Sequence, residues 1–282
     1  MKIWAFVALV LSVCLGGQPV HAEVVQFHSA GRPPTPLQAR MARERGVPPQ
    51  TGPGDLISGE LYRPQGTGPF PALVMLHTCR GRLASASEQK IATSFTALGF
   101  VVLAVDSFGP RGVGEQCVVA TAVIDRIADA YGALDWLTGQ SFVVPTRVAL
   151  LGLSQGANVA FEIASSRDTM GRTDRATFAA AILYYPYCHP TDPPAKIPTL
   201  ILIGDADDWT PARQCQAMAV QHAGAGTVEE LIVYPGAQDG FNLVDLKGNA
   251  LSLYGHRMVY EETADQAAQE AAASFLIKWM AH

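Results

Sequence analysis

The chain has 282 residues, a formal net charge of −5 and 49% hydrophobic residues. This length is sufficient for one large domain, and no internal repeat or linker divides the chain. A mildly acidic chain without a basic block gives no electrostatic case for a nucleic acid or an anionic membrane as a partner.

The N-terminus has the pattern of a secretory signal peptide over residues 1–22. Lys2 is the only charged residue before Glu23, and Ile3–Leu15 is almost entirely apolar. Val20-His21-Ala22 then places small residues at the positions that signal peptidases favour. The apolar run is too short to span a bilayer comfortably. We therefore expect a periplasmic or secreted protein without a membrane anchor after cleavage.

Residues 23–54 are rich in Pro, Gly and Arg and show no sustained period. We interpret them as an N-terminal arm that lies over the domain or lacks fixed structure. The folded domain is predicted over residues 55–282.

Strands and helices alternate along that domain, which predicts an α/β fold with a doubly wound, mostly parallel sheet and helices on both faces. In such sheets the reactive groups gather at the carboxyl ends of the strands. The predicted strands are 57–64, Ala72–His77, Phe100–Asp106, Arg147–Ser154, 178–186, 198–205 and 229–236, and the predicted helices are Ser87–Leu98, Val118–Leu137, Ala157–Ser166, Ala212–Ala223 and Thr263–Met280.

One of these strand ends carries the sequence GLSQG, with Ser154 at its centre. This is a G-x-S-x-G pattern between an apolar strand and a helix, the context in which it forms a nucleophile elbow. The glycines allow a sharp turn that exposes the serine hydroxyl, and the helix N-terminus favours a developing oxyanion. An ordinary turn is the alternative. The context favours Ser154 as a nucleophile.

A serine nucleophile needs a base and an acid that orients the base, and in this fold the chain order is Ser, then Asp or Glu, then His. The segment ILIGDADDWTP supplies three acidic residues after a later strand, and we choose Asp207 as the acid. Asp205 and Asp208 are then a solvated turn or a helix cap. The missing Gly and terminal Glu argue against an EF-hand-like calcium loop, and the absence of a CxxC motif argues against zinc.

Several segments together resemble the dienelactone hydrolase family, within the α/β-hydrolase fold, from about Asp55 to the C-terminus. They are GPFPALVMLHTCRG, AVDSFGPRG with a following Cys, DAYGALDWL, RVALLGLSQGANVA, LYYPYC, GDADDWTPARQC, YPGAQDGF and GHRMVY. The resemblance implies an ester or lactone hydrolase with a small-molecule substrate and no cofactor. Much of the family has a cysteine nucleophile, and members with serine are also familiar.

The same resemblance implies roles for residues around Ser154. Ser154 and Asp207 take their usual catalytic roles, and the backbone N–H groups of Cys79 and Gln155 form the oxyanion hole. Thr78 stands where the family usually has a glycine, a departure that bears on the placement of the Cys79 donor.

The main departure from the family lies in the loop YPGAQDGF, where the family pattern Y-P-G-A-x-H-G-F has its general-base histidine. Asp239 occupies that position. A carboxylate is a far weaker base than imidazole near neutral pH, with a reference pKa of about 3.9 against about 6.5. It also faces Asp207, and two carboxyls in contact raise one pKa so that a proton is shared.

Three interpretations of Asp239 follow: a disabled or weakened triad, rescue by another histidine, or a water that relays the proton to Asp239. We rank the weakened hydrolase first. A non-catalytic small-molecule binding protein on a hydrolase scaffold is the competing function. Among the other histidines, His256 is nearest in sequence, His77 ends a strand and suits a structural hydrogen bond, and His189 and His222 suit a loop or the surface.

Four cysteines remain after the signal peptide is removed, and three pairings are open. Cys79 and Cys117 follow two consecutive strands, as do Cys188 and Cys215. We therefore predict the disulfides 79–117 and 188–215. The alternative is that one pair remains reduced and buried.

Arginines and aromatic residues near the same edge are candidates for substrate binding. Arg80 and Arg111 could hold a substrate carboxylate, and a salt bridge to Glu115 or another nearby acid is the alternative. Trp209 and Phe241 are expected to line the pocket, and packing beneath a loop explains them equally well. Arg126, with Asp129 and Asp135, is interpreted as a solvated helix face.

Overall fold

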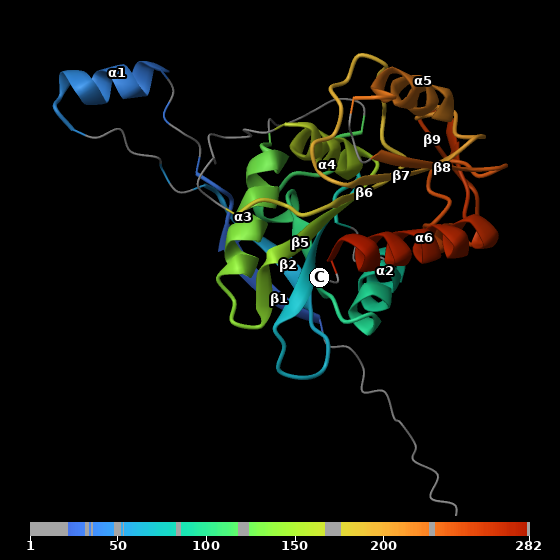
Figure 1. The fold of residues 1–282 in the computed structure, drawn as a ribbon, viewed down its shortest axis with the longest axis horizontal. Helices are drawn as coiled ribbons and strands as arrows, with labels where there is room; N and C mark the ends of the chain where they lie inside the picture. Colours follow the sequence, from blue (N-terminus) through green and yellow to red (C-terminus); the bar gives the residue numbers. More distant parts are fainter. Residues whose placement is uncertain are drawn as a thin grey trace, which may run out of the picture.

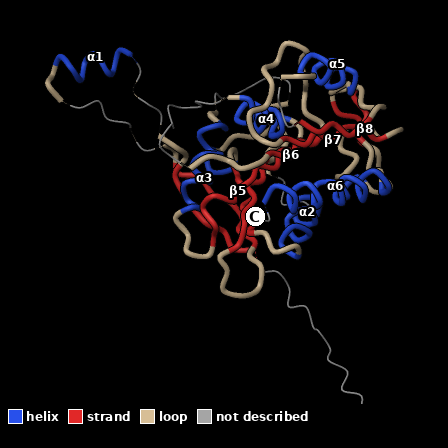
Figure 2. The backbone as a smooth tube through the Cα atoms, viewed as in Figure 1, coloured by secondary structure: helices blue, strands red, loops and turns tan. Residues whose placement is uncertain are grey.

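The computed structural model describes residues 22–31, 34, 36–47, 52, 54–82, 86–117, 124–166, 176–225 and 229–280. Its centre is an eight-stranded sheet in the order β1-β2-β4-β3-β5-β6-β7-β8 (Figures 1 and 2). β3 to β8 run parallel to one another, while β1 and β2 pair in the antiparallel sense. The strands are β1 Ala22–His28, β2 Leu56–Tyr62, β3 Phe70–Leu76, β4 Val101–Asp106, β5 Val143–Leu153, β6 Ala181–Tyr184, β7 Thr199–Gly204 and β8 Glu229–Tyr234.

Helices cover both faces of this sheet, as expected for a doubly wound fold (Figure 1). α2 and α6 lie on one face, where Lys90 and Asp265 form an ion pair between them. α3, α4 and α5 lie on the other face, and α1 stands apart from the sheet. The helices are α1 Pro36–Glu44, α2 Ala86–Ala97, α3 Arg126–Thr138, α4 Gln155–Ser165, α5 Ala212–His222 and α6 Glu262–Met280.

The core lies along the central strands, which are buried on both faces. Residues on both faces of β3, β4, β6 and β7 are nearly all buried. These strands are therefore continuous apolar runs in the sequence. Burial of each large aliphatic side chain stabilises the fold by about 1.5–3 kcal/mol. The segments with the most continuous apolar runs are therefore also those that hold the sheet together.

Two described parts of the sheet structure were not predicted. The first is β1, which pairs with β2 at the edge of the sheet and lies in the segment interpreted as an arm. Its burial pattern shows only Phe27 as fully buried, and Val24 is 71% exposed. The second is a small hairpin of β9 (Leu251–Leu253) and β10 (His256–Met258). β1 is too exposed, and β9 and β10 are too short, to show the alternation of apolar and polar residues that predicts a strand.

The topology brings four loops to one edge of the sheet. Cys79 follows β3, Ser154 follows β5, Asp207 follows β7, and Asp239 follows β8. Because these strands are parallel, their carboxyl ends meet at one edge. A short 3-10 turn, η1 (Gly109–Arg111), follows β4 at the same edge, and another, η3 (Val244–Leu246), follows the Asp239 loop.

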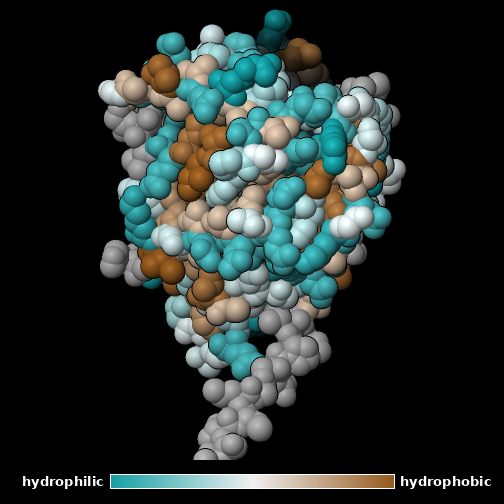
Figure 3. Space-filling model, turned by 90° about the vertical axis from the view of Figure 1, so that its right-hand side faces the viewer, coloured by the Kyte–Doolittle hydropathy of each residue, from teal (hydrophilic) through white to brown (hydrophobic). Residues whose placement is uncertain are grey.

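On the face shown in Figure 3, apolar side chains form scattered patches among polar residues. Within the described ranges, none of the helices combines the length and apolarity needed to cross a bilayer. Residues 1–21, on which the signal-peptide prediction rests, lie outside the described part of the chain, as does the first part of the predicted helix from Val118.

Candidate active site

Ser154 occupies a strained turn between β5 and α4. Its φ of 52° and ψ of −117° are unusual for a residue with a side chain and typically cost about 1–3 kcal/mol. Hydrogen bonds hold the turn in place: Ser154 N donates to Tyr184 O at 3.0 Å, and Ser154 O accepts from Ala157 N at 2.8 Å. Strain of this kind at a strand-to-helix junction is the geometry of a nucleophile elbow.

Both glycines of the GLSQG motif are required by close backbone contacts. A Cβ on Gly152 would lie 2.3 Å from Gly156 O. A Cβ on Gly156 would lie 2.3 Å from Leu76 O and 2.6 Å from His77 O. The elbow therefore packs directly against the end of β3, which brings Gln155 beside the residues that precede Cys79.

A buried arginine links Gln155 to His77, which stands two residues before Cys79. Arg126 Nη2 donates to His77 O at 2.6 Å, and Arg126 Nη1 donates to Gln155 Oε1 at 2.9 Å. Arg126 is only 6% exposed and Asp129 is fully buried, so the interpretation of these residues as a solvated helix face is wrong. Sequence reasoning missed Arg126, because a charged residue at the start of a helix normally faces water.

Asp207 is a buried carboxylate that its own loop holds in place. Its Oδ1 accepts from Trp209 N at 2.9 Å and Thr210 N at 2.8 Å, and its Oδ2 accepts from Thr210 Oγ1 at 2.7 Å. Burial raises the pKa of Asp207, and these hydrogen bonds oppose the rise. The arrangement fixes the carboxyl in one orientation, as an orienting acid requires.

Backbone contacts join the Asp207 loop to the YPGAQDGF loop. A Cβ on Gly204 would lie 2.0 Å from Ala237 O, so only glycine lets the two loops approach this closely. Ala206 N donates to Ala237 O at 3.0 Å, and Gly236 N donates to Asp205 Oδ1 at 2.6 Å. The loop that should supply the base therefore lies directly against the acid.

Asp239 is buried in that loop with a carboxyl oxygen that lacks a partner. It is 1% exposed, and among the described residues its Oδ1 has no hydrogen-bond partner. A hydrogen bond fixes its backbone, because Val259 N donates to Asp239 O at 3.2 Å. Burial, followed by the charges of Asp207 and Asp208, raises the pKa of Asp239 well above its ordinary value. The neutral, protonated form of this carboxyl is thus favoured relative to that of an exposed aspartate.

The other histidines divide into structural and peripheral ones. His77 Nδ1 donates to Thr78 O at 2.7 Å and its Nε2 accepts from Ser107 N at 3.2 Å, which matches the structural role predicted for it. His189 lies in an exposed loop. His222 is buried and lies 2.7 Å from Glu229 Oε2, so its assignment to the surface is wrong.

His256 stands on β10, at the rim of the Asp207 loop. Its ring stacks on Trp209 with centroids 4.8 Å apart, and its Nδ1 lies 3.3 Å from Asp208 Oδ1. β10 also reaches the base loop, because Met258 forms a bridge with Asp239. The histidine nearest in sequence is therefore also close to the acid loop, but its described partner is Asp208 rather than Asp207.

Both predicted disulfides are present. Cys79 and Cys117 are bonded across a separation of 38 residues, and Cys188 and Cys215 across 27. In the chain-entropy treatment, loops of these sizes stabilise the folded state by about 3.5–4 kcal/mol each. The first disulfide fastens the loop after β4 to the residue that follows β3, beside the candidate oxyanion hole.

Among the substrate-binding candidates, Arg111 forms a salt bridge. It donates to both carboxyl oxygens of Asp129, at 2.9 and 2.8 Å, and to Asp55 at 2.8 Å. Burial opposes its charge, but the bonds to Asp129 outweigh this and raise the pKa of Arg111. The salt-bridge alternative therefore describes Arg111, with Asp129 and Asp55 as the acids instead of Glu115.

The remaining candidates differ in exposure. The backbone N–H of Arg80 donates to Thr78 Oγ1 at 3.2 Å, and its side chain is partly exposed at the sheet edge. Trp209 is half-buried beside His256. Phe241 is fully buried among the rings of Tyr184, Tyr185 and Tyr234, so it packs beneath the loop.

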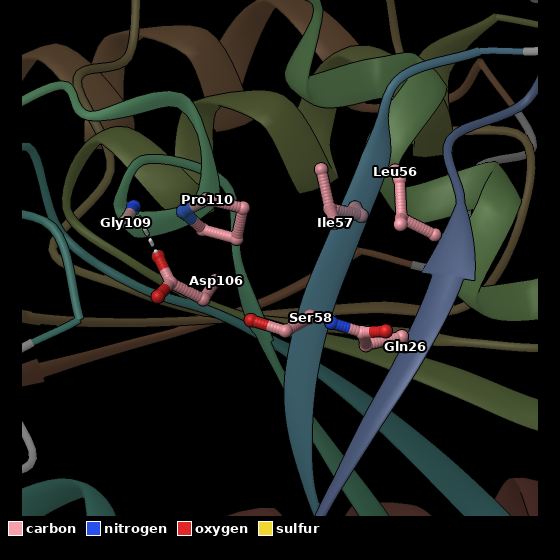
Figure 4. A pocket seen from close by; sticks show the side chains of 7 residues that line it. All are labelled: Gln26, Leu56, Ile57, Ser58, Asp106, Gly109 and Pro110. Atoms are coloured by element: carbon pink, nitrogen blue, oxygen red, sulfur yellow. Dashed lines mark hydrogen bonds between the residues drawn. The ribbon is translucent and has the colours of Figure 1, made fainter.

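A pocket of about 440 Å³ lies elsewhere on the sheet edge, between β1, β2 and the turn after β4 (Figure 4). Asp106 Oδ1 accepts from Gly109 N at 2.8 Å there, and the side chain of Ser58 lies close by in the same view. Its lining contains none of the candidate catalytic residues. In the described ranges, no three His, Cys, Asp or Glu side chains are grouped so as to hold a metal ion.

Comparison with known proteins agrees with this architecture. The model of the dienelactone hydrolase family matches residues 57–281. An uncharacterized protein of Mycobacterium tuberculosis strain H37Rv, Rv2307c, is 28% identical over 286 residues, covering 94% of this chain and 96% of its own length.

Solved structures share the fold at lower identity. A dienelactone hydrolase-like promiscuous phosphotriesterase from metagenomic libraries has a TM-score of 0.66 and 18% identity, covering 92% of this chain and 98% of its own. A thermophilic esterase from the planctomycete Thermogutta terrifontis has a TM-score of 0.60 and 21% identity, with coverages of 79% and 87%. The family model spans most of the chain, and the mostly parallel sheet brings the loops named above to one edge. The chain therefore belongs to the dienelactone hydrolase family.

Proposed function

We propose that this protein hydrolyses a small ester or lactone through an acyl-serine intermediate, and that Asp239 weakens the reaction. The observation that carries the proposal is the strained Ser154, which stands between two glycines that no larger residue can replace. An ordinary turn has no need of this strain. A hydroxyl that must project above the sheet toward a substrate does need it.

In the proposed reaction, Ser154 Oγ attacks the carbonyl carbon of the substrate. The carbonyl oxygen becomes an oxyanion, which the backbone N–H groups of Cys79 and Gln155 bind. Loss of the alcohol leaves an acyl-serine, which water then hydrolyses. Both steps need a group that takes a proton, and the family position for that group is Asp239.

Asp239 can accept a proton only as a carboxylate. Burial and the neighbouring acids raise its pKa, so a smaller fraction of it is ionised near neutral pH. The fraction of the basic form rises with pH through that raised pKa. We therefore expect hydrolysis to be slow near neutrality and to increase as the pH is raised, with a water between the serine and the carboxylate.

Replacement of the missing base tests the proposal. We expect Asp239→His to raise kcat/KM for 4-nitrophenyl acetate by about 10²–10⁴-fold, the usual contribution of general-base catalysis. Asp207 would then orient the new imidazole. Ser154→Ala should abolish hydrolysis in both backgrounds. Fast wild-type turnover that Asp239→His slows would show that Asp239 is not a missing base.

A second function has one observation in its favour. Asp239 is a buried carboxyl with a raised pKa beside Asp207, which suits a site that binds a small molecule without turning it over. Fluorophosphonate labelling separates the two functions, because an activated serine reacts and an idle one does not. Labelling of the wild type that Ser154→Ala removes supports the hydrolase, and an unlabelled wild type supports the binding protein.

We further propose that the protein works in an oxidising compartment, in the periplasm or outside the cell. Two disulfides support this, because such bonds persist where thiols are not kept reduced.

A further inference from the structure

Arg126 is a buried guanidinium that the proposed chemistry does not use directly. It stands at the first position of α3 and is 6% exposed. Burial lowers its pKa to about 10, so it remains charged at neutral pH. The acid whose charge acts on it is Asp129, and both oxygens of that carboxylate are already bonded by Arg111. Burying a charge without a bonded counter-ion costs free energy, which a functional role for Arg126 would explain.

Arg126 contacts one candidate oxyanion residue, Gln155, and also His77, which stands two residues before the other, Cys79. Nη2 holds the carbonyl of His77, and Nη1 holds the side chain of Gln155. The guanidinium also lies over the ring of Phe108, at 5.3 Å, and that ring packs edge-on against His77 at 4.6 Å. Its Nε has no hydrogen-bond partner among the described residues. The fork of one side chain thus connects the end of β3 to the start of α4.

His77 extends this control to the next peptide. Its Nδ1 donates to Thr78 O at 2.7 Å. In a trans peptide the carbonyl and the following N–H point in opposite directions, so fixing Thr78 O also fixes the direction of Cys79 N–H. Gln116 N donates to Cys79 O at 2.7 Å and fixes the following peptide in turn. A hydrogen bond therefore fixes the peptide on each side of Cys79.

We propose that Arg126 is the positioning residue of the oxyanion hole: it sets the spacing between the Cys79 and Gln155 N–H groups and places a positive charge behind them. The proposal rests on the ester-hydrolase function above. It also offers a structural basis for Thr78 at a position where the family usually has glycine, since the Arg126–His77 contacts supply the backbone control. Preorganised donors of this kind stabilise charge that develops in the transition state.

Arg126→Met tests this role, with Arg82→Met as the matched control. Arg82 is also a buried arginine, bonded to Glu60, Glu88 and Ala104 O, but it has no described contact with the oxyanion residues. For 4-nitrophenyl acetate, in both the wild-type and the Asp239→His backgrounds, we expect Arg126→Met to lower kcat about 100-fold with KM within about twofold. Arg126→Lys keeps the charge but only one of the two bonds, and its kcat should be intermediate. Arg82→Met should lower the melting temperature and leave both kinetic constants within about twofold.

A second measurement does not depend on turnover. Benzoate is an anion that can occupy an oxyanion hole, and benzyl alcohol is a neutral molecule of similar shape. Arg126→Met should weaken benzoate binding about tenfold and leave benzyl alcohol binding unchanged, as measured by NMR titration. If Ser154→Ala leaves ester hydrolysis intact, the proposed function fails, and the benzoate comparison still decides the role of Arg126.

A folded Arg126→Met protein whose kcat and benzoate affinity both stay within twofold of the parent overturns the proposal. If Arg126→Met does not fold, Gln155→Met is judged by the same criteria. That variant removes the acceptor of Nη1 and keeps the backbone N–H, and we expect its kcat to fall about tenfold with KM unchanged.

Discussion

The two halves of the candidate site differ in how completely they are built. On the serine side, the strained backbone of Ser154, the close approach of Gly156 to β3 and the bonds of Arg126 all support one geometry. On the other side, Asp207 is held by its own loop, but the partner it should orient is the carboxyl of Asp239. Under the proposed mechanism, the first half is complete, and the second contains two acids where an acid and a base are expected.

This difference separates two kinds of catalytic requirement. The serine half depends on backbone geometry over many residues, so the fold itself maintains it. The base half depends on the chemistry of one side chain, which a single substitution can change without disturbing the sheet. Under the proposed mechanism, the site retains the geometry of a hydrolase while its proton acceptor is altered.

The largest effect should come from Gly156→Ala, which attacks the backbone of the serine half. The added Cβ would meet Leu76 O at 2.3 Å, and a backbone atom in the centre of a sheet cannot move aside. We expect the free energy of unfolding, measured with denaturant, to fall by about 3 kcal/mol or more.

Gly236→Ala is the matched control in the other half. Gly236 has a φ of +73° and nothing within 4 Å of an added Cβ, so only the backbone conformation is penalised, by about 1–2 kcal/mol. Equal losses of stability in the two variants would contradict the difference drawn between the two halves.

A smaller effect is expected from Asp239→Asn, which replaces the unpartnered acid with a neutral amide. Because the pKa of Asp239 is raised above the unfolded value of about 3.9, the folded chain keeps a proton that the unfolded chain releases. The free energy of unfolding of the wild type therefore falls as the pH rises from about 4 toward the raised pKa.

Asp239→Asn should remove that loss. We expect its melting temperature at pH 8 to exceed that of the wild type by about 2–4 °C, the shift that 1 kcal/mol produces in a domain of this size. At pH 4 the two proteins should melt at nearly the same temperature. A difference that does not change with pH would mean that Asp239 is ionised in the folded chain.

The smallest effect should follow His256→Ala. The ring lies on Trp209 and faces Asp208, whose side chain is exposed, and a pair of this kind contributes about 1 kcal/mol or less. We expect ester hydrolysis by the wild type to stay within about threefold. A loss of tenfold or more, absent when the same change is made in the Asp239→His background, would make His256 the substitute base.

Much of the sheet could be predicted because its central strands are buried on both faces. The runs around Val74, Leu103 and Ile201 are continuously apolar, and the helices between them have a clear period. Parallel order then places the ends of these strands together, which is why the disulfides 79–117 and 188–215 and the proximity of the Asp207 and Asp239 loops followed from the sequence.

Other parts could not be predicted, for separate physical reasons. β1 exposes most of its side chains, so its pairing comes from backbone bonds that leave no mark on the sequence. Arg126 and Asp129 lie three residues apart on one helix and were interpreted as a solvated pair. In the structure they have different partners: Arg126 donates to Gln155 at the start of α4, and Asp129 accepts from Arg111 in the turn after β4. Which buried charge meets which group depends on tertiary packing alone.

The Cys79–Cys117 bond makes one wall of the candidate site dependent on the redox state of its surroundings. Cys79 supplies one candidate oxyanion N–H, and its carbonyl accepts from Gln116 N in the same loop that the disulfide closes. Oxidation of this pair therefore fastens the β4 loop to the residue that should face the substrate. A chain kept in a reducing compartment would lack this covalent link, and the wall of the candidate site at Cys79 would depend on hydrogen bonds such as that from Gln116 N.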